Sequence, residues 1–305
     1  MIYIKLDKDS DKYIENKYKR IPKFFRKILI KLKKGKLILD KKENLEYVIL
    51  PNMSQKNLKK LRNLSDIKCW KNVCVSDNLI ENREFIDFAK EKSFVIMDGK
   101  WLFKNIVDKI VEYVADYKSE PLAMQEVSFL CNQADEIILE KIKEIAIQVK
   151  ICNILTDFPK QFKKLEEIIY KTNGIILNIS NNYKRAAAKS SIVVNFDFSE
   201  NELEQCFFKK NVFMIHLNKN IKINNKDSRN IISYKINLPE KYLKYPRIFE
   251  GFHSNILYES FIFRNTNYKN IRNQLQKDNI KIVNLEDANQ KIMKSRSKTL
   301  DKIQI

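Results

Sequence analysis

The residues best placed for phosphate chemistry lie in the turn at 129–135, which has the sequence FLCNQAD and joins a predicted strand to a predicted helix. Such a turn presents free backbone N–H groups. In dinucleotide-binding proteins it carries G-x-G-x-x-G, because glycines make the turn tight and admit a pyrophosphate to the backbone. This turn contains no glycine. Asn132 and Gln133 are therefore candidate cofactor contacts by position, but we expect NAD(P) to bind weakly or not at all.

Two later positions could also contact an anionic ligand. Asp157 ends the second predicted strand of this region, where a carboxylate commonly binds the cofactor ribose; the competing interpretation is that it caps the helix beginning near Pro159. Ser180, Lys184 and Arg185 follow the third strand and open a short helix, so backbone N–H groups and two bases could bind a phosphate there. The competing interpretation is an ordinary capped turn with solvated bases.

His216 and Asp197 are the candidates for acid–base catalysis. His216 ends a predicted strand and Asp197 ends its expected neighbour, and the carboxyl edge of an open α/β sheet is where ligands bind. The alternative is that His216 is a buried packing residue. The chain has two histidines and five cysteines, with no C-x-x-C pair, so we expect no metal site. The cysteines are interpreted mostly as small buried residues.

The segment 17–36 contains ten Lys or Arg residues and no Asp or Glu. Pro22 suits a first helical turn and Gly35 a C-terminal cap, and apolar residues recur at helical spacing between them. This pattern predicts a basic amphipathic helix that binds nucleic acid or lies on an anionic membrane. The alternative is that its apolar stripe packs on the protein's own core while the lysines stay solvated. The candidate contacts for an anionic partner are Lys23, Arg26, Lys27, Lys31 and Lys34.

Short apolar runs alternate with helical patterns over most of the chain, which indicates an α/β fold with mainly parallel sheets covered on both faces. We predict a Rossmann-like, mostly parallel sheet and a second, smaller α/β domain at the N-terminus, divided by the helix break at 118–121. The strands predicted for the Rossmann-like sheet are 127–131, 151–155, 175–179, 192–196 and 212–217. The predicted organisation is a basic segment 1–42, a small α/β domain 43–118, a Rossmann-like domain 122–240, C-terminal helices packing across the domains in 241–289, and a flexible tail 290–305.

The net charge of +20 has two interpretations. A basic surface favours anionic partners, whereas an excess of Lys over Arg, with abundant Asn and Ile, also results from an AT-rich coding sequence. No apolar stretch approaches the roughly 18–20 residues that cross a bilayer, and the N-terminus runs into charged residues without a signal-peptide core. We therefore expect a cytoplasmic protein without a transmembrane segment.

The stretch 151–217 carries an ordered set of short motifs. Residues 152–157 (CNILTD) lead into 160–165 (KQFKKL), and 190–197 (SSIVVNFD) precede 211–217 (NVFMIHL). This order resembles the NAD(P)-binding domain of the shikimate dehydrogenase and glutamyl-tRNA reductase families, over about a quarter of the chain. The resemblance implies a Rossmann fold and a nicotinamide cofactor. However, the glycine fingerprint, the Lys and Asp pair of the first family and the Ser-Thr-Cys-Asn-Arg segment of the second are missing, so no catalytic residue carries over.

The sequence therefore leaves three functions open. The leading one is a non-catalytic ligand-binding or regulatory module with a degenerate dinucleotide site, whose partner is a small anionic ligand. The second is an NAD(P)-dependent oxidoreductase with an atypical cofactor turn. The third is an adaptor that binds nucleic acid or acidic lipid through the basic helix in 17–36.

Overall fold

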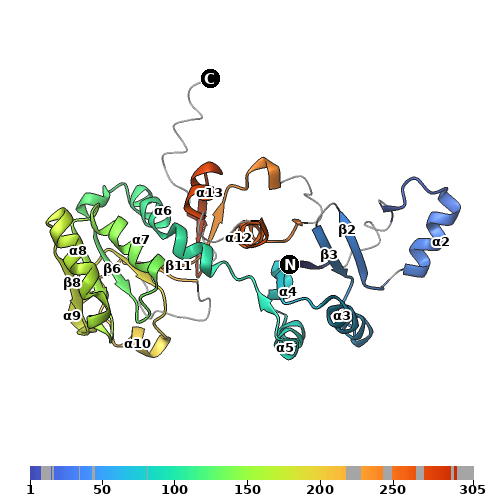
Figure 1. The fold of residues 1–305 in the computed structure, drawn as a ribbon, viewed down its shortest axis with the longest axis horizontal. Coiled ribbons are helices and arrows are strands. Elements are labelled where there is room, and N and C mark those ends of the chain that lie inside the picture. The colour runs from blue at the N-terminus through green and yellow to red at the C-terminus, as the bar shows by residue number, and fades with distance from the viewer. Residues whose placement is uncertain are drawn as a thin grey trace, which may run out of the picture. The chain divides into compact units, whose positions relative to one another are not determined.

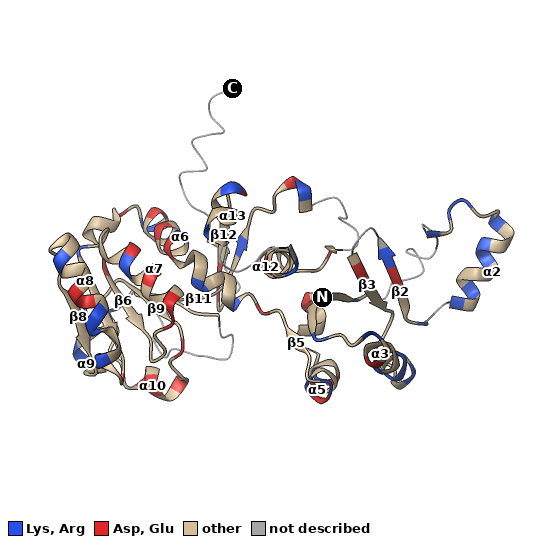
Figure 2. Ribbon diagram, in the orientation of Figure 1, with Lys and Arg blue, Asp and Glu red and all other residues tan. Residues whose placement is uncertain are grey.

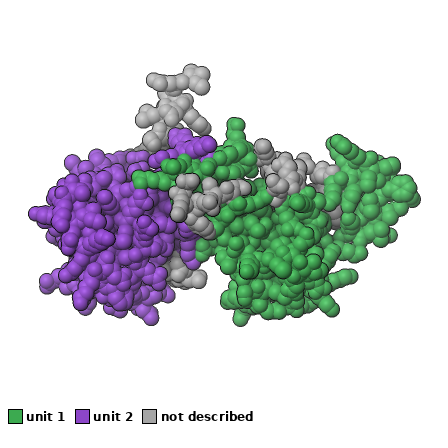
Figure 3. All heavy atoms as spheres, in the orientation of Figure 1, with its two compact units in different colours: residues 1–99, 238–274 green, residues 100–237, 275–305 purple. Residues whose placement is uncertain are grey.

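The computed structural model has the mixed α/β architecture that the sequence predicts. Its contacts divide the chain into two compact units, each built around a sheet of its own. Unit 1 comprises residues 1–99 and 238–274, and unit 2 comprises residues 100–237 and 275–305 (Figure 3). The structure describes residues 1–7, 15, 17–33, 35–42, 45–80, 82–217, 228–242, 249–265, 271–289 and 292–293.

The described strands of unit 1 form one sheet in the order β2-β3-β1-β4-β5 (Figure 1). β1 lies between β3 and β4 and is parallel to both, β5 is parallel to β4, and β2 is antiparallel to β3. The bounds are Ile2–Leu6 for β1, Ile38–Lys42 for β2, Leu45–Leu50 for β3, Asn72–Val75 for β4 and Val95–Ile96 for β5.

Side chains of β1 alternate between the two faces of this sheet, as the pleat of a strand requires. Ile2 and Ile4 pack in the core shared with α3 (Gln55–Lys68) and α5 (Arg83–Glu91). Tyr3 packs on the other face, where its ring centroid lies 5.2 Å from that of Phe249 and 6.1 Å from that of Phe261. The helices of unit 1 are α2 (Lys23–Lys33), α3 (Gln55–Lys68), α4 (Asp77–Ile80), α5 (Arg83–Glu91), η3 (Glu240–Tyr242) and α12 (Ser254–Asn265).

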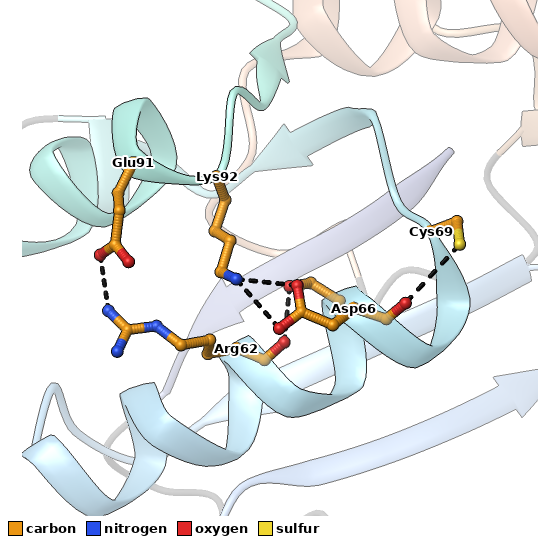
Figure 4. Close-up of polar contacts among 6 residues, drawn as sticks. Arg62, Asp66, Cys69, Glu91 and Lys92 are labelled. Carbon is orange, nitrogen blue, oxygen red and sulfur yellow. Dashed lines mark hydrogen bonds and ion pairs between the residues drawn. The ribbon is translucent and has the colours of Figure 1, made fainter.

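Two ion pairs join α3 to the end of α5 (Figure 4). Arg62 Nη2 lies 2.5 Å from Glu91 Oε2, and Lys92 Nζ lies 2.8 Å from Asp66 Oδ1. Cys69 follows α3 in left-handed backbone, and its thiol donates to the Asp66 carbonyl oxygen at 3.6 Å. Because most of these groups are exposed, each ion pair contributes at most about 1 kcal/mol to stability.

Unit 2 contains a sheet whose described strands follow the order β13-β12-β11-β10-β9-β6-β7-β8. The six strands from β6 to β11 are all parallel, while β12 and β13 extend the sheet antiparallel. Numbered along the chain, these six strands have the order 3-2-1-4-5-6 of a dinucleotide-binding Rossmann fold. The bounds are Glu126–Leu130 for β6, Ile151–Leu155 for β7, Leu177–Ser180 for β8, Ile192–Asn195 for β9, Phe213–Ile215 for β10, Arg229–Ile236 for β11, Ile282–Asp287 for β12 and Ile292–Met293 for β13.

The five strands predicted for this sheet are confirmed, because β6 to β10 coincide with the predicted apolar runs to within two residues. Each is followed by a helical segment or a turn, as parallel connections require. The helices of unit 2 are α6 (Lys100–Lys118), η1 (Leu122–Met124), α7 (Glu136–Ala146), η2 (Pro159–Phe162), α8 (Lys163–Asn173), α9 (Tyr183–Ala186) and α10 (Glu200–Glu204), and α13 (Ile271–Lys277) straddles the boundary between the units.

Helix α6 belongs to unit 2, whereas the sequence pattern predicts it as the last helix of the N-terminal domain. Its Phe103 ring lies 5.9 Å from that of Phe196 and 6.4 Å from that of Tyr234. Its Tyr113 hydroxyl lies within hydrogen-bonding distance of two carbonyl oxygens, those of Val283 (3.1 Å) and Met293 (3.0 Å). The helix ends at the predicted break, but its buried face packs against the sheet of unit 2.

The N-terminal segment also differs from its expected organisation. Part of 1–42 forms β1 and β2, and β1 is a central strand of the first sheet. In 241–289 the helices α12 and α13 lie where helical patterns are predicted, but β12 is a strand. Of the tail 290–305, only β13 is among the described residues. Within the described part of the chain, no helix has the length and apolar composition needed to cross a bilayer.

Candidate functional site

The turn after β6 binds a carboxylate from its own chain. The backbone N–H of Asn132 donates to Asp197 Oδ1 at 2.8 Å, and that of Gln133 donates to Asp197 Oδ2 at 2.7 Å. Asp197 follows β9, which pairs directly with β6 in the register Leu130 to Asn195. Asn132 and Asp197 therefore each lie two positions beyond the end of a strand, and the two strand ends are paired at the same edge of the sheet.

This contact crosses the place where a Rossmann fold binds its ligand. In the strand order 3-2-1-4-5-6, the connections after the first and fourth strands leave toward opposite faces, and the crevice between them receives the pyrophosphate. In unit 2 these strands are β6 and β9. Both oxygens of the Asp197 carboxylate are thus bonded to turn amides of the kind that hold a phosphate in that crevice.

A second carboxylate, that of Asp135, caps the N-terminus of α7. Asp135 is the N-cap of α7, and its Oδ1 accepts the Ile138 N–H at 2.8 Å. Its other oxygen, Oδ2, lies 2.6 Å from Lys104 Nζ of α6. An N-cap carboxylate satisfies an N–H that the first helical turn leaves unpaired and interacts favourably with the helix dipole. The N-terminus of α7 is thereby already paired with a negative group.

The Asn132 side chain links the turn to two neighbouring segments. Its Nδ2 donates to Glu202 Oε1 of α10 at 2.8 Å. Its Oδ1 accepts the backbone N–H of Asp157 at 2.8 Å and the Thr156 hydroxyl at 3.3 Å. Glu202 also forms a capping box with Ser199 at the start of α10. One asparagine thus holds together the connections that follow β6, β7 and β9.

Burial shifts the pKa of two groups at this edge. Burial raises the pKa of Asp197, and the hydrogen bonds from Asn132 and Gln133 lower it, with the net effect upward. Burial likewise raises the pKa of the Cys131 thiol, with the Asp197 charge adding to the rise. Cys131 is buried, so it is a packing thiol without the low pKa of a nucleophile.

The side chains of the other predicted cofactor residues do not join the contact between Asp197 and the turn, although the Asp157 backbone N–H donates to the Asn132 side chain. The Asp157 carboxylate accepts a short hydrogen bond from the Tyr183 hydroxyl, so the expectation that it caps a helix is wrong. Ser180 Oγ accepts the Asn182 N–H at 2.9 Å. Lys184 and Arg185 are exposed on α9, a single turn. These groups follow β7 and β8, and β8 is separated from the β6–β9 pair by β7.

His216 lies directly after β10 and is only 1% exposed. Its backbone N–H donates to the Ile231 carbonyl oxygen of β11 at 2.9 Å, which continues the parallel ladder. Such burial is typical of the packing residue that was the alternative interpretation. Asp197, its expected acid–base partner, directs both carboxylate oxygens at the turn after β6 instead.

The predicted basic helix is present as α2, which includes Lys23, Arg26, Lys27 and Lys31. Lys34 lies outside the described residues. The alternative that Phe25, Ile28 and Leu32 pack on the protein's core is wrong, because all three side chains are exposed. Among the described residues, no group of three or more His, Cys, Asp or Glu side chains is arranged to hold a metal ion.

Three residues of this edge are not among the candidates from the sequence: Asp135, Tyr183 and Glu202. Asp135 stands immediately before an amphipathic helical pattern, which is the position of an N-cap and could have identified it. Glu202 is recognisable from the sequence as a capping-box residue, but its bond to Asn132 joins positions 70 residues apart. Tyr183 carries no sequence pattern that points to Asp157.

No protein-family model matches the chain. No curated protein matches its sequence. Solved structures with a similar arrangement include a D-lactate dehydrogenase from Treponema pallidum, which is 10% identical with a TM-score of 0.29 over 70% of either chain. A shikimate dehydrogenase in complex with NADP+ is 10% identical, with a TM-score of 0.28 over 71% of this chain and 75% of its own.

An NAD-dependent formate dehydrogenase from Staphylococcus aureus is 9% identical, with a TM-score of 0.31 over 70% of this chain and 72% of its own. These proteins are Rossmann-type dehydrogenases, and one belongs to a family that 151–217 resembles. The similarity to these proteins is weak and concerns the fold alone. Nothing about the activity of this chain follows from it.

Proposed function

We propose that this chain is a non-catalytic, Rossmann-like ligand-binding or regulatory module whose dinucleotide site is closed by its own Asp197. The observation that carries this proposal is the pair of hydrogen bonds from the Asn132 and Gln133 amides to that carboxylate. A pyrophosphate at the β6 turn would need the same two donors. It would therefore have to displace a charged group that is already bonded to both.

Charge supports the same proposal. A pyrophosphate entering this edge would meet three acidic side chains: Asp197, the Asp135 cap and Glu202. One cation, Lys104, is paired with Asp135. Like charges at close range cost free energy, and the cost grows where water is partly excluded. The turn after β6 is thus suited to hold a carboxylate of the protein rather than a phosphate ligand.

The oxidoreductase alternative requires more rearrangement. Asp197 would have to leave both amides, and the side chains of Asn132 and Gln133 would have to admit a pyrophosphate where a dehydrogenase has glycine. In addition, His216 is too buried to reach a substrate from its present position. The ligand of the module would be a small anion bound by the exposed bases Lys184 and Arg185.

Calorimetric titration of the full chain with NAD⁺, NADH, NADP⁺ and NADPH tests the proposal. We expect no saturable heat with any of the four. Low-micromolar affinity for one of them would contradict the proposal and favour the oxidoreductase. Titration with inorganic phosphate tests the anion site, because Lys184→Gln/Arg185→Gln should abolish any binding. The matched control Lys160→Gln/Lys164→Gln removes two exposed charges from elsewhere in unit 2.

A further inference from the structure

Helix α2 turns its apolar side chains to solvent. Phe24 is 69% exposed, Phe25 58%, Ile28 41% and Leu32 59%; these four residues are named the apolar stripe. At 100° per residue they fall within an arc of about 100° on the helix. The Phe24 and Phe25 rings lie edge to face, 5.6 Å apart between centroids. A contiguous exposed apolar face of this kind marks an interaction site.

The contacts of α2 with the rest of unit 1 come from a different side of the helix. Ile30 packs against the core cluster that includes Ile38 and Tyr47, together with Tyr18. Lys33 Nζ donates to the Tyr18 hydroxyl at 2.5 Å and lies 4.8 Å from the centre of its ring. On a helical wheel, Ile30 and Lys33 lie outside the arc of the apolar stripe. The helix is thus attached through one face while the stripe points outward.

The charge beside the stripe is entirely positive. Lys23, Lys27 and Lys31, named the lysine row, follow one edge of the stripe at i, i+4 and i+8 and are exposed. No Asp or Glu occurs between positions 17 and 36, and Figure 2 shows only Lys and Arg as charged residues along α2. The complementary partner is therefore anionic as well as able to receive apolar side chains.

We propose that α2 docks on an anionic lipid bilayer, with the apolar stripe in the boundary between headgroups and acyl chains and the lysine row at the headgroups. An interfacial helix gains from both terms: burial of its apolar face and attraction to anionic lipid. A nucleic acid would use the lysines and could stack on Phe24 or Phe25. A nucleic acid offers no apolar environment that could bury the aliphatic side chains of Ile28 and Leu32. These two residues therefore favour a lipid partner.

Co-sedimentation of the full chain with vesicles tests this surface. We expect binding to vesicles of phosphatidylcholine with phosphatidylserine, little binding to phosphatidylcholine alone, and a steep loss of affinity as salt rises. Replacing the lysine row with Gln should weaken binding on the order of a hundredfold. Replacing the apolar stripe with Ser should weaken it at least about tenfold. Both sets of side chains are exposed, so circular dichroism should show an unchanged fold.

The matched control replaces Lys160, Lys164 and Lys171 with Gln, which removes the same charge from exposed positions of unit 2. It should bind vesicles like the wild type. In Phe24→Trp, brominated acyl chains should quench the added fluorescence above the background of Trp70 and Trp101 if the stripe enters the bilayer. The proposal is overturned if the wild type does not bind anionic vesicles at low salt, if the lysine-row and control variants bind equally, or if duplex DNA or single-stranded RNA binds and vesicles do not.

Discussion

Asp197 and Asn132 lie at the ends of two paired parallel strands, and the Asp197 carboxylate accepts the Asn132 backbone N–H at 2.8 Å. The contact joins positions 65 residues apart across the switch point of the sheet. The second oxygen of the Asp197 carboxylate accepts the backbone N–H of Gln133 at 2.7 Å. The geometry resembles that of a bound anion at a strand-to-helix turn, with a side chain in place of the ligand.

Removing this carboxylate should open the turn to external anions. In Asp197→Ala the two amides lose a charged acceptor, so we expect a loss of about 2 kcal/mol in the free energy of unfolding. The same change removes a negative charge, so inorganic pyrophosphate should bind at least about tenfold more tightly than to the wild type. Calorimetry of both proteins measures this. Asp157→Ala removes an equal charge outside the turn, and an equal gain there would contradict the assignment.

The raised pKa of Asp197 predicts a specific dependence of stability on pH. Because burial raises the folded-state pKa, the unfolded chain loses its proton first as pH rises. The stability that comes from this shift in pKa is therefore fully present below about pH 3.9 and is lost as pH rises through the folded-state pKa, while the bonds from the two amides remain. Relative to Asp197→Asn, the wild type should lose stability across that window. Denaturant unfolding of both proteins at several pH values tests this, and a relative gain for the wild type would refute it.

Much of the fold could be predicted from the sequence because unit 2 is built from short apolar strands. β6, β7, β9 and β10 are almost wholly buried, so their runs of Val, Ile, Leu and Phe identify them. β2 could not be recognised in the same way, since it is an edge strand that ends in Asp40, Lys41 and Lys42. β1 is only five residues long and leads directly into polar sequence.

The candidate site was less predictable, because it depends on which strands are neighbours. The sequence places Asn132 and Gln133 at a phosphate-binding turn, and their amides do bind an anionic group. That the group is Asp197 follows from the pairing of β6 with β9, which no local pattern encodes. The same dependence explains why the sequence pattern predicts an acid–base pair of Asp197 with His216, which follows the neighbouring strand β10.

The Asn132 side chain should be a principal stabiliser of the sheet edge. Asn132→Ala would remove its bonds to Glu202, to the Asp157 N–H and to Thr156. We expect a loss of about 2 kcal/mol in the free energy of unfolding, because partly buried polar groups lose their partners. Asn181→Ala is the control, since Asn181 is exposed and should change stability by less than about 0.5 kcal/mol. Equal effects of the two changes on urea unfolding would contradict this role.

The capping box of α10 should contribute separately measurable stability. The Glu202 N–H donates to Ser199 Oγ at 3.4 Å, and the Ser199 N–H donates to Glu202 Oε2 at 2.6 Å. Ser199→Ala should therefore cost about 1 kcal/mol in urea unfolding. Ser54→Ala is a matched control, because Ser54 is the N-cap of α3 without a side-chain cap bond and should change stability far less.

Glu202 couples this cap to the turn after β6, because its other oxygen, Oε1, accepts the Asn132 side-chain N–H at 2.8 Å. If either Asn132 or Ser199 is lost, the Glu202 carboxylate is held less firmly, so its bond to the remaining partner contributes less stability. In a double-mutant cycle, Asn132→Ala and Ser199→Ala should therefore be non-additive by at least about 0.5 kcal/mol. Additive losses would mean that the cap and the turn are stabilised independently, and that Glu202 does not couple α10 to the turn after β6.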